Sequence, residues 1–259
     1  MSSPHKERWY RRLAHKLGYD LVKFNKQITV ETHLRALLPV LKVDLVLDVG
    51  ANEGQYAQAL RYVGYTGDIM SFEPAAAAYA RLSQRAQADP RWQTFNLALS
   101  DTQGSAELHQ SAASVFNSLH ATSEFGRQKF GASITADTTE TISLNRFDEF
   151  AAQHLPDLAK RRVFLKMDTQ GHDLAVMRGC GDWATRFCGL QSEVAVMPIY
   201  EGIPDYMQAI SEYRALGYEV TGLFTVSRNR ASGHVVEFDC VMAPPAQVSG
   251  NLQPQLSEG

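Results

Sequence analysis

The sequence lacks the features that mark secreted, membrane-spanning and nucleic-acid-binding proteins. It has only three cysteines, Cys180, Cys188 and Cys240, without Cys-x-x-Cys spacing, which predicts neither a disulfide framework nor a zinc site. No apolar run approaches the ~18 residues that a membrane-spanning helix needs, and residues 1–10 are too polar for a secretory signal. The net charge of -3 gives no support to general nucleic-acid binding. Together these absences predict a cytoplasmic protein that does not bind nucleic acid.

The charge that is present is unevenly distributed. Residues 1–27 contain seven Lys or Arg and two acidic residues, a net +5, which leaves -8 for the rest of the chain. Apolar residues recur there at helical spacing and predict a basic amphipathic helix within an extension over residues 1–40; they are Trp9, Leu13, Leu17, Leu21 and Phe24. Two interpretations remain open. The stripe packs on the domain or on a homodimer partner, or it makes peripheral contact with an anionic membrane.

From residue 41 to residue 243, short apolar runs alternate with segments of helical spacing. This alternation predicts a doubly wound α/β domain with a mainly parallel sheet. The expected strands cover residues 44–49, 67–72, 92–99, 163–167, 190–196, 218–223 and 235–242, and the clearest helices cover 75–88, 173–178 and 205–216. The Pro/Gln/Ser-rich tail at 244–259 is predicted to be disordered.

An insertion at about residues 104–145 interrupts this alternation between the third and fourth strands. Residues 104–110 alternate like a strand, and residues 111–137 are rich in Ser, Thr, Gly and Ala. Long polar insertions beside an α/β sheet commonly cover a substrate or form mobile loops. We therefore expect a mobile cover over the site.

The turn after the first strand indicates a nucleoside cofactor. Gly50 and Gly54 allow close backbone approach to a ligand, and Glu73 ends the second strand, where a carboxylate can accept both ribose hydroxyls. The turn lacks the GxGxxG pattern, and Glu53 would place a negative charge near a pyrophosphate. Asp48 instead suits a ligand with a cationic amine. These features favour S-adenosylmethionine over a nicotinamide dinucleotide.

Four sequence blocks resemble the FkbM-type methyltransferases. They cover residues 46–54, 71–74, 98–101 with Gly104, and 164–173 with Gly179. The resemblance implies a class I methyltransferase (Rossmann-like) fold, with a seven-stranded sheet whose last strand is antiparallel. It also implies O-methylation of hydroxyls, often on sugars or polyketide-like products.

The resemblance also implies cofactor contacts. Asp48, Gly50, Asn52 and Gly54 would line the methionine end, and Glu73 would hold the ribose. The adenine would be flanked by residues 98–101, with Ala98, Ser100 and Asp101 as the contacts. Many relatives carry a Glu where Gln170 stands.

Three side chains are candidates for catalysis. The segment 168–171 reads Asp-Thr-Gln-Gly where enzymes that methylate base amines commonly carry Asn/Asp-Pro-Pro-aromatic, which disfavours a nucleic-acid base as the acceptor. An alcohol needs a general base or a metal, and the candidates at the carboxyl edge of the sheet are Asp168, His172 and Glu193. Each candidate also has a purely structural alternative. Asp168 could cap the next helix, His172 could lie over the sheet edge without a catalytic role, and Glu193 could form an ion pair with Lys166 or an Arg. The pattern favours His172 as the base and predicts no metal.

The sequence as a whole predicts an S-adenosylmethionine-dependent O-methyltransferase. Its acceptor would be a hydroxyl of a sugar, a lipid-linked sugar (glycolipid) or a glycosylated secondary metabolite. Two alternatives remain: a non-catalytic S-adenosylmethionine-binding interaction module and a nicotinamide-dependent reductase.

Overall fold

The computed structural model describes residues 13–14, 16–18, 29–111, 113–134, 136–229 and 231–245 of the 259-residue chain. Most of the predicted basic helix at 1–27 and most of the predicted tail at 244–259 lie outside these residues. Within the described ranges, no helix is both long and apolar enough to cross a membrane.

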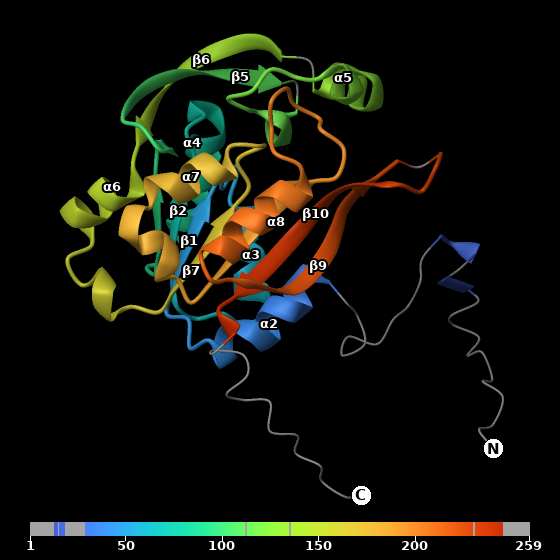
Figure 1. Ribbon diagram of the computed structural model, residues 1–259. Coiled ribbons are helices and arrows are strands. Elements are labelled where there is room, and N and C mark those ends of the chain that lie inside the picture. The colour runs from blue at the N-terminus through green and yellow to red at the C-terminus, as the bar shows by residue number, and fades with distance from the viewer. Residues whose placement is uncertain are drawn as a thin grey trace, which may run out of the picture.

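Seven strands form the central sheet in the order β3-β2-β1-β7-β8-β10-β9 (Figure 1). Neighbouring strands are parallel except that β10 is antiparallel to both β8 and β9. The strands are β1 (Leu45–Val49), β2 (Asp68–Phe72), β3 (Trp92–Phe95), β7 (Val163–Met167), β8 (Gly189–Ala195), β9 (Glu219–Arg228) and β10 (Val235–Ala243). The arrangement confirms the predicted class I fold with an antiparallel last strand.

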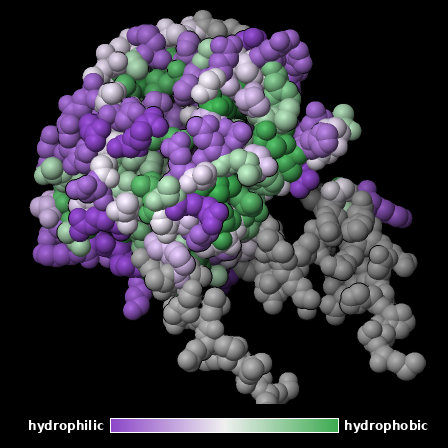
Figure 2. Space-filling model, viewed as in Figure 1, coloured by the Kyte–Doolittle hydropathy of each residue, from purple (hydrophilic) through white to green (hydrophobic). Residues whose placement is uncertain are grey.

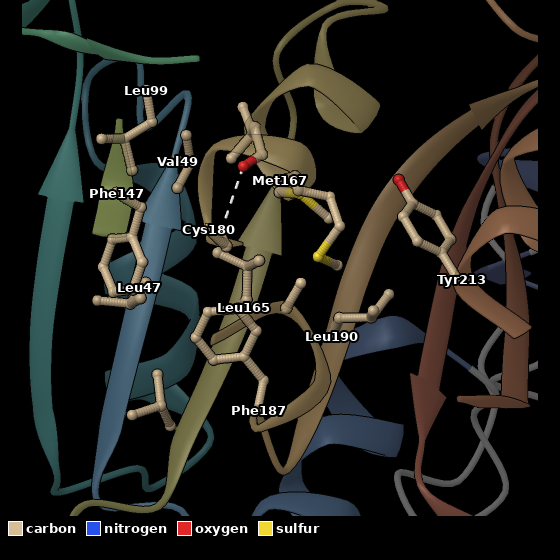
Figure 3. Packing of buried hydrophobic residues seen from close by; sticks show 14 of the residues in the cluster. Leu47, Val49, Leu99, Phe147, Leu165, Met167, Cys180, Phe187, Leu190 and Tyr213 are labelled. Carbon is tan, nitrogen blue, oxygen red and sulfur yellow. Dashed lines mark hydrogen bonds between the residues drawn. The ribbon is translucent and has the colours of Figure 1, made fainter. Parts of the chain in front are cut away.

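Helices cover both faces of this sheet, which explains why β1 is buried along its whole length. Alternate residues of β1 point to opposite faces, so Leu45, Leu47 and Val49 join one core cluster and Val46 the other. The first cluster packs against α6 (Phe147–His154), α7 (Asp173–Gly179) and α8 (Tyr206–Ala215), and Figure 3 shows its centre. The second packs against α2 (Val30–Val40), α3 (Gln55–Tyr62) and α4 (Ala76–Ala86).

Helix α2 belongs to the sheet domain, although the sequence places it in the extension at 1–40. Thr29 and Thr32 form a capping box at its start. Leu34, Leu37 and Leu38 are buried in the second core cluster. The packed domain therefore begins before residue 41, because these leucines cover the sheet.

The predicted strand at 92–99 is two strands in two different sheets. After β3, the Asn96 side chain donates hydrogen bonds to the carbonyl oxygens of Glu73 and Pro74, 2.9 Å each. The chain then turns into β4 (Ala98–Leu99), which pairs with β6 (Ala136–Asn145). The apolar pattern continues across the break because Ala98 and Leu99 are also buried.

The insertion forms a second sheet of order β4-β6-β5, with β5 covering Gly104–Ser111. Figure 1 shows this sheet above the ends of β1 and β2. Between β5 and β6 lie the short helices η2 (Ser114–Phe116), α5 (Glu124–Phe130) and η3 (Gly131–Ser133). Ile134 is fully buried with Ile199, Tyr200 and Val236. The insertion thus has an apolar attachment to the main domain that its polar composition did not suggest.

Strand β9 is longer than the predicted strand at 218–223. It continues because Phe224 pairs with Asp239 and Arg228 with Val235 of β10. Leu223, at the end of the predicted strand, and Val226, in the extension, are exposed on the surface. Figure 2 shows hydrophobic residues gathered near these two strands on an otherwise largely hydrophilic face.

Candidate functional site

The turn after β1 is built on backbone that favours glycine. Gly50 has a φ of +73°, and a Cβ there would lie 2.0 Å from the carbonyl oxygen of Asp168. Gly54 has a φ of +89°, and a Cβ there would lie 2.7 Å from the Trp92 ring. Gly50 lines the main cavity, whereas Gly54 does not and serves the packing of α3.

Glu73 lies at the end of β2 with only 6% of its surface exposed. The backbone N–H groups of Asn52 and Ala75 donate to its two carboxylate oxygens, at 2.8 and 2.9 Å. Burial raises the pKa of Glu73 to about 7, although these hydrogen bonds favour the anion. Glu73 and Asn52 both face the cavity, so a carboxylate is available where the sequence predicts ribose recognition.

Asp48 is fully buried beneath the turn and does not line the cavity. Lys166 Nζ lies 3.0 Å from Asp48 Oδ1, and Ser71 Oγ donates to the other oxygen at 3.0 Å. Burial opposes the charge of Lys166, but the nearby carboxylates of Asp48 and Asp168 together outweigh it and raise the lysine pKa. Lys166 Nζ also donates to the Gly50 carbonyl oxygen. The pair therefore supports the turn from below, and Asp48 has a protein cation where we expected a ligand amine.

Residues 98–101 divide between the cavity and its surroundings. Ala98 and Leu99 line the cavity. Ser100 and Asp101 do not: Ser100 Oγ lies 2.9 Å from His172 Nε2, and the Asp101 carboxylate pairs with Arg178 at 3.0 Å. Of the predicted adenine contacts, only Ala98 has access to the cavity.

Asp168 and Glu193 lie together at the carboxyl ends of β7 and β8, joined by Gln170. Gln170 Nε2 donates to Asp168 Oδ1 at 3.0 Å and to Glu193 Oε2 at 2.8 Å. Burial raises the pKa of Glu193 well above its ordinary value, and the charge of Asp168 raises it further. Lys166 lies 3.7 Å from Asp168 and pairs with Asp48, so the predicted ion pair between Lys166 and Glu193 is not formed.

His172 immediately precedes α7 and lines both the main cavity and a second one beside α7 and α8. Burial and the neighbouring His120, whose ring centre is 5.8 Å away, lower the pKa of His172 to about 4. Its contact with Ser100 places it beside the segment predicted to flank adenine. The structure thus separates His172 from the bond network of the two carboxylates.

The main cavity has a volume of about 350 Å³, within the range of small-molecule sites. The insertion supplies much of its roof, including Ser114–Leu119, Leu108, Phe130 and Ile142. Four carboxylates line it, those of Glu73, Asp168, Glu193 and Glu237, and no described residue that lines it is Lys or Arg.

Sequence reasoning missed Glu237, whose Oε2 accepts a hydrogen bond from Ser227 Oγ at 2.8 Å. It stands inside an apolar strand, the same signal that singled out Glu193. The insertion residues that line the cavity carried no comparable signal. Among the described residues, no group of three or more His, Cys, Asp or Glu is arranged to hold a metal ion.

The strand order and the cavity at the carboxyl edge define a class I methyltransferase. The chain belongs to the FkbM methyltransferase family, since the "Methyltransferase FkbM domain" model matches residues 48–220. It is 23% identical over 169 residues to "2-O-methyltransferase NoeI" of Sinorhizobium fredii (strain NBRC 101917 / NGR234), and the match spans 61% of this chain and 66% of that relative.

A solved structure of methyltransferase FkbM from Methylobacillus flagellatus KT is also similar. The TM-score is 0.50 at 15% sequence identity, with 78% of this chain and 43% of that chain covered. At this identity the likeness concerns the fold.

Proposed function

We propose that this methyltransferase transfers the methyl group of S-adenosylmethionine to a hydroxyl oxygen of a sugar, either free or within a glycolipid or glycosylated metabolite. The observation that carries the proposal is the lining of the cavity. It has a carboxyl group at the expected ribose position, three more elsewhere in its wall, and no Lys or Arg among its described lining residues. Burial raises the pKa of Glu73, Glu193 and Glu237, so these groups carry less negative charge at neutral pH than exposed carboxylates do. The lack of basic side chains disfavours the pyrophosphate of a nicotinamide dinucleotide, and the remaining negative charge suits a cationic cofactor.

The residues present fit the cofactor at three points. Gly50 lets the turn pack closely against Asp168 while it lines the cavity, Glu73 offers an acceptor to the ribose hydroxyls, and Ala98 and Leu99 offer apolar contact to adenine. When bound, S-adenosylmethionine supplies a methyl group on a sulfonium leaving group. We assign no contact with its amine to Asp48, because Lys166 neutralises that carboxylate.

Glu193 is the proposed general base, with Asp168 beside it. With the cofactor bound, Glu193 would accept the hydroxyl proton of the acceptor as its oxygen takes the methyl group and the sulfur leaves as the neutral thioether. Burial raises the pKa of Glu193 and so makes its carboxylate a stronger proton acceptor, whereas the pKa of the His172 imidazole is lowered to about 4. His172 is therefore proposed to position the cofactor from the cavity wall, which it lines together with Ala98 and Leu99, and its hydrogen bond with Ser100 holds it there.

The sugar assignment is supported by the polar groups of the roof and wall, which suit a hydroxyl-rich ligand; they include Asn117, Ser118, Gln170 and Ser227. The 2-O-methyltransferase relative is consistent with an oxygen acceptor.

The first test is calorimetric titration with S-adenosylhomocysteine and, separately, with NAD. We expect binding of the former only. The second is a methyl-transfer assay on sugars, glycolipids and non-sugar alcohols, read by mass spectrometry. Transfer to amines alone would contradict O-methylation, and cofactor binding without any transfer across the panel would favour a non-catalytic binding module.

A further inference from the structure

Gln170 makes hydrogen bonds to three side chains at once. Its amide N–H groups donate to Asp168 and Glu193, and its Oε1 accepts from the Tyr200 hydroxyl at 2.8 Å. The backbone at Gln170 is left-handed, with a φ of +52°. Since both amide hydrogens point to carboxylates, the side chain cannot itself accept a proton from a substrate. Its hydrogen bonds instead hold the Asp168 and Glu193 carboxyl groups in place.

The same residue is tied to the insertion. Ser118 Oγ donates to the Gln170 carbonyl oxygen at 2.9 Å. The Tyr200 hydroxyl lies 3.1 Å from the carbonyl oxygen of Phe116 and so shares its proton between the insertion and Gln170. Phe116 and Ser118 both line the roof of the cavity. A displacement of this roof segment therefore changes the hydrogen bonds that fix Gln170.

We propose that Gln170 is a positioning residue that couples the roof segment at residues 114–119 to the orientation of the Glu193 carboxylate. Gln170 donates a hydrogen bond to Oε2 of Glu193, and Glu193 lines the cavity. Closure of the roof over an acceptor fixes Tyr200 and Ser118, and through Gln170 it fixes the proton acceptor. The consequence for catalysis rests on the proposed function, but the coupling itself is a property of the folded chain.

Gln170→Met tests the coupling, because methionine has a similar length and no amide. The matched control is Gln128→Met, in α5 of the same insertion, where the exposed amide donates a hydrogen bond to Glu124. Two quantities are measured, each with and without S-adenosylhomocysteine. They are the titration midpoint of the Glu193 carboxyl, by carbon-13 NMR with Glu193→Gln for assignment, and amide hydrogen exchange at residues 114–119.

We expect Gln170→Met to raise the Glu193 midpoint by about one pH unit, because the anion loses a hydrogen-bond donor. Asp173, Glu237 and Asp239 also face Glu193, and neither substitution alters them. Asp168 faces it too and loses its own hydrogen bond from Gln170 in Gln170→Met, so a change at Asp168 contributes to the expected shift. Exchange at residues 114–119 should accelerate by about tenfold. Gln128→Met should leave both quantities unchanged.

Tyr200→Phe provides an independent variant if Gln170→Met does not fold. It removes the hydroxyl between the roof and Gln170 but keeps both bonds from Gln170 to the carboxylates. We expect faster exchange at residues 114–119 with a smaller change in the Glu193 midpoint.

An unchanged midpoint in folded Gln170→Met, unchanged exchange in both variants, or equal effects of Gln128→Met would overturn the proposal. Failure of S-adenosylhomocysteine to bind wild-type protein would instead contradict the proposed function, because the coupling is still measured in the free protein.

Discussion

Glu73 is buried, and its carboxylate already accepts hydrogen bonds from two backbone N–H groups. In the proposed cofactor site it would also accept hydrogen bonds from the ribose hydroxyls. Glu73→Ala should weaken S-adenosylhomocysteine binding by about 1.5–3 kcal/mol, the scale of lost hydrogen bonds to a charged group. Isothermal titration calorimetry measures this directly. An unchanged dissociation constant would remove Glu73 from the cofactor site.

The pH dependence of the same binding follows from the raised pKa of Glu73, about 7 in the free protein. A ligand that donates hydrogen bonds to Glu73 prefers the ionised form. Affinity should therefore be full above pH 7 and fall by up to tenfold per pH unit below it. Glu73→Gln is the control, because an uncharged amide should flatten this part of the profile.

Substitutions of Glu193 and His172 distinguish which of the two side chains accepts the proton. Glu193→Gln should lower kcat by about 10²- to 10⁴-fold with little change in cofactor affinity. His172→Ala should chiefly weaken cofactor binding, since His172 contacts Ser100. Steady-state kinetics with calorimetry separates the two effects. A large loss of kcat in His172→Ala alone would restore the imidazole as the base.

The methyl transfer should not depend on a divalent metal. Asp168 and Glu193 each accept a hydrogen bond from Gln170, so one oxygen of each carboxylate is already engaged by an amide. We expect activity assayed in excess EDTA to remain near its starting value. Loss of activity that Mg²⁺ or Mn²⁺ restores would assign these carboxylates to a metal instead.

For individual residues, the sequence predicts which side chains take part in the site better than it predicts what each side chain contacts. Glu73 and Glu193 stand out because a carboxylate beside or inside an apolar strand needs a reason. The partnership of Asp48 with Lys166 depends on the register of β1 against β7, in which the two residues are neighbours. Strand register depends on contacts distant in sequence, which no local pattern reveals.

The insertion is predicted to be mobile in the free protein and to become ordered when an acceptor binds. Residues 111–137 are attached through Ile134 and through Ser123, whose hydroxyl donates to the Pro198 carbonyl oxygen. We expect amides in the roof segment to exchange faster than those of β1 in the free protein. Their exchange should slow when cofactor product and an active acceptor are added together. Slow exchange in the free protein, measured by mass spectrometry, would show a fixed wall.

The ends of helices and strands can be predicted from the sequence where a nearby side chain, such as a helix cap, determines them. Asp205 caps α8 with a hydrogen bond to the N–H of Gln208, close to the predicted start of that helix. The break between β3 and β4 depends instead on Asn96 reaching the chain after β2. Such a break cannot be read from hydrophobicity, because both halves are buried.

The basic segment at residues 1–27 determines whether the whole molecule is predicted to bind membranes or to pack this segment against itself or a second copy. If its apolar stripe binds membranes, the full chain should float with anionic vesicles and not with neutral ones, and removal of residues 1–27 should abolish flotation. Loss of soluble folding after the same truncation would favour packing against the domain or a second copy. Vesicle flotation and size-exclusion chromatography distinguish these outcomes.

The position of β10 between β8 and β9 has a consequence for how the chain is made. During synthesis, β8 and β9 emerge before the strand that joins them, so the growing chain exposes unpaired backbone on both until about residue 243 has left the ribosome. Glu237 arrives with that last strand, after Glu73, Asp168 and Glu193. The cavity is therefore complete only after β10 has paired with β8 and β9, so ligand binding depends on the finished sheet.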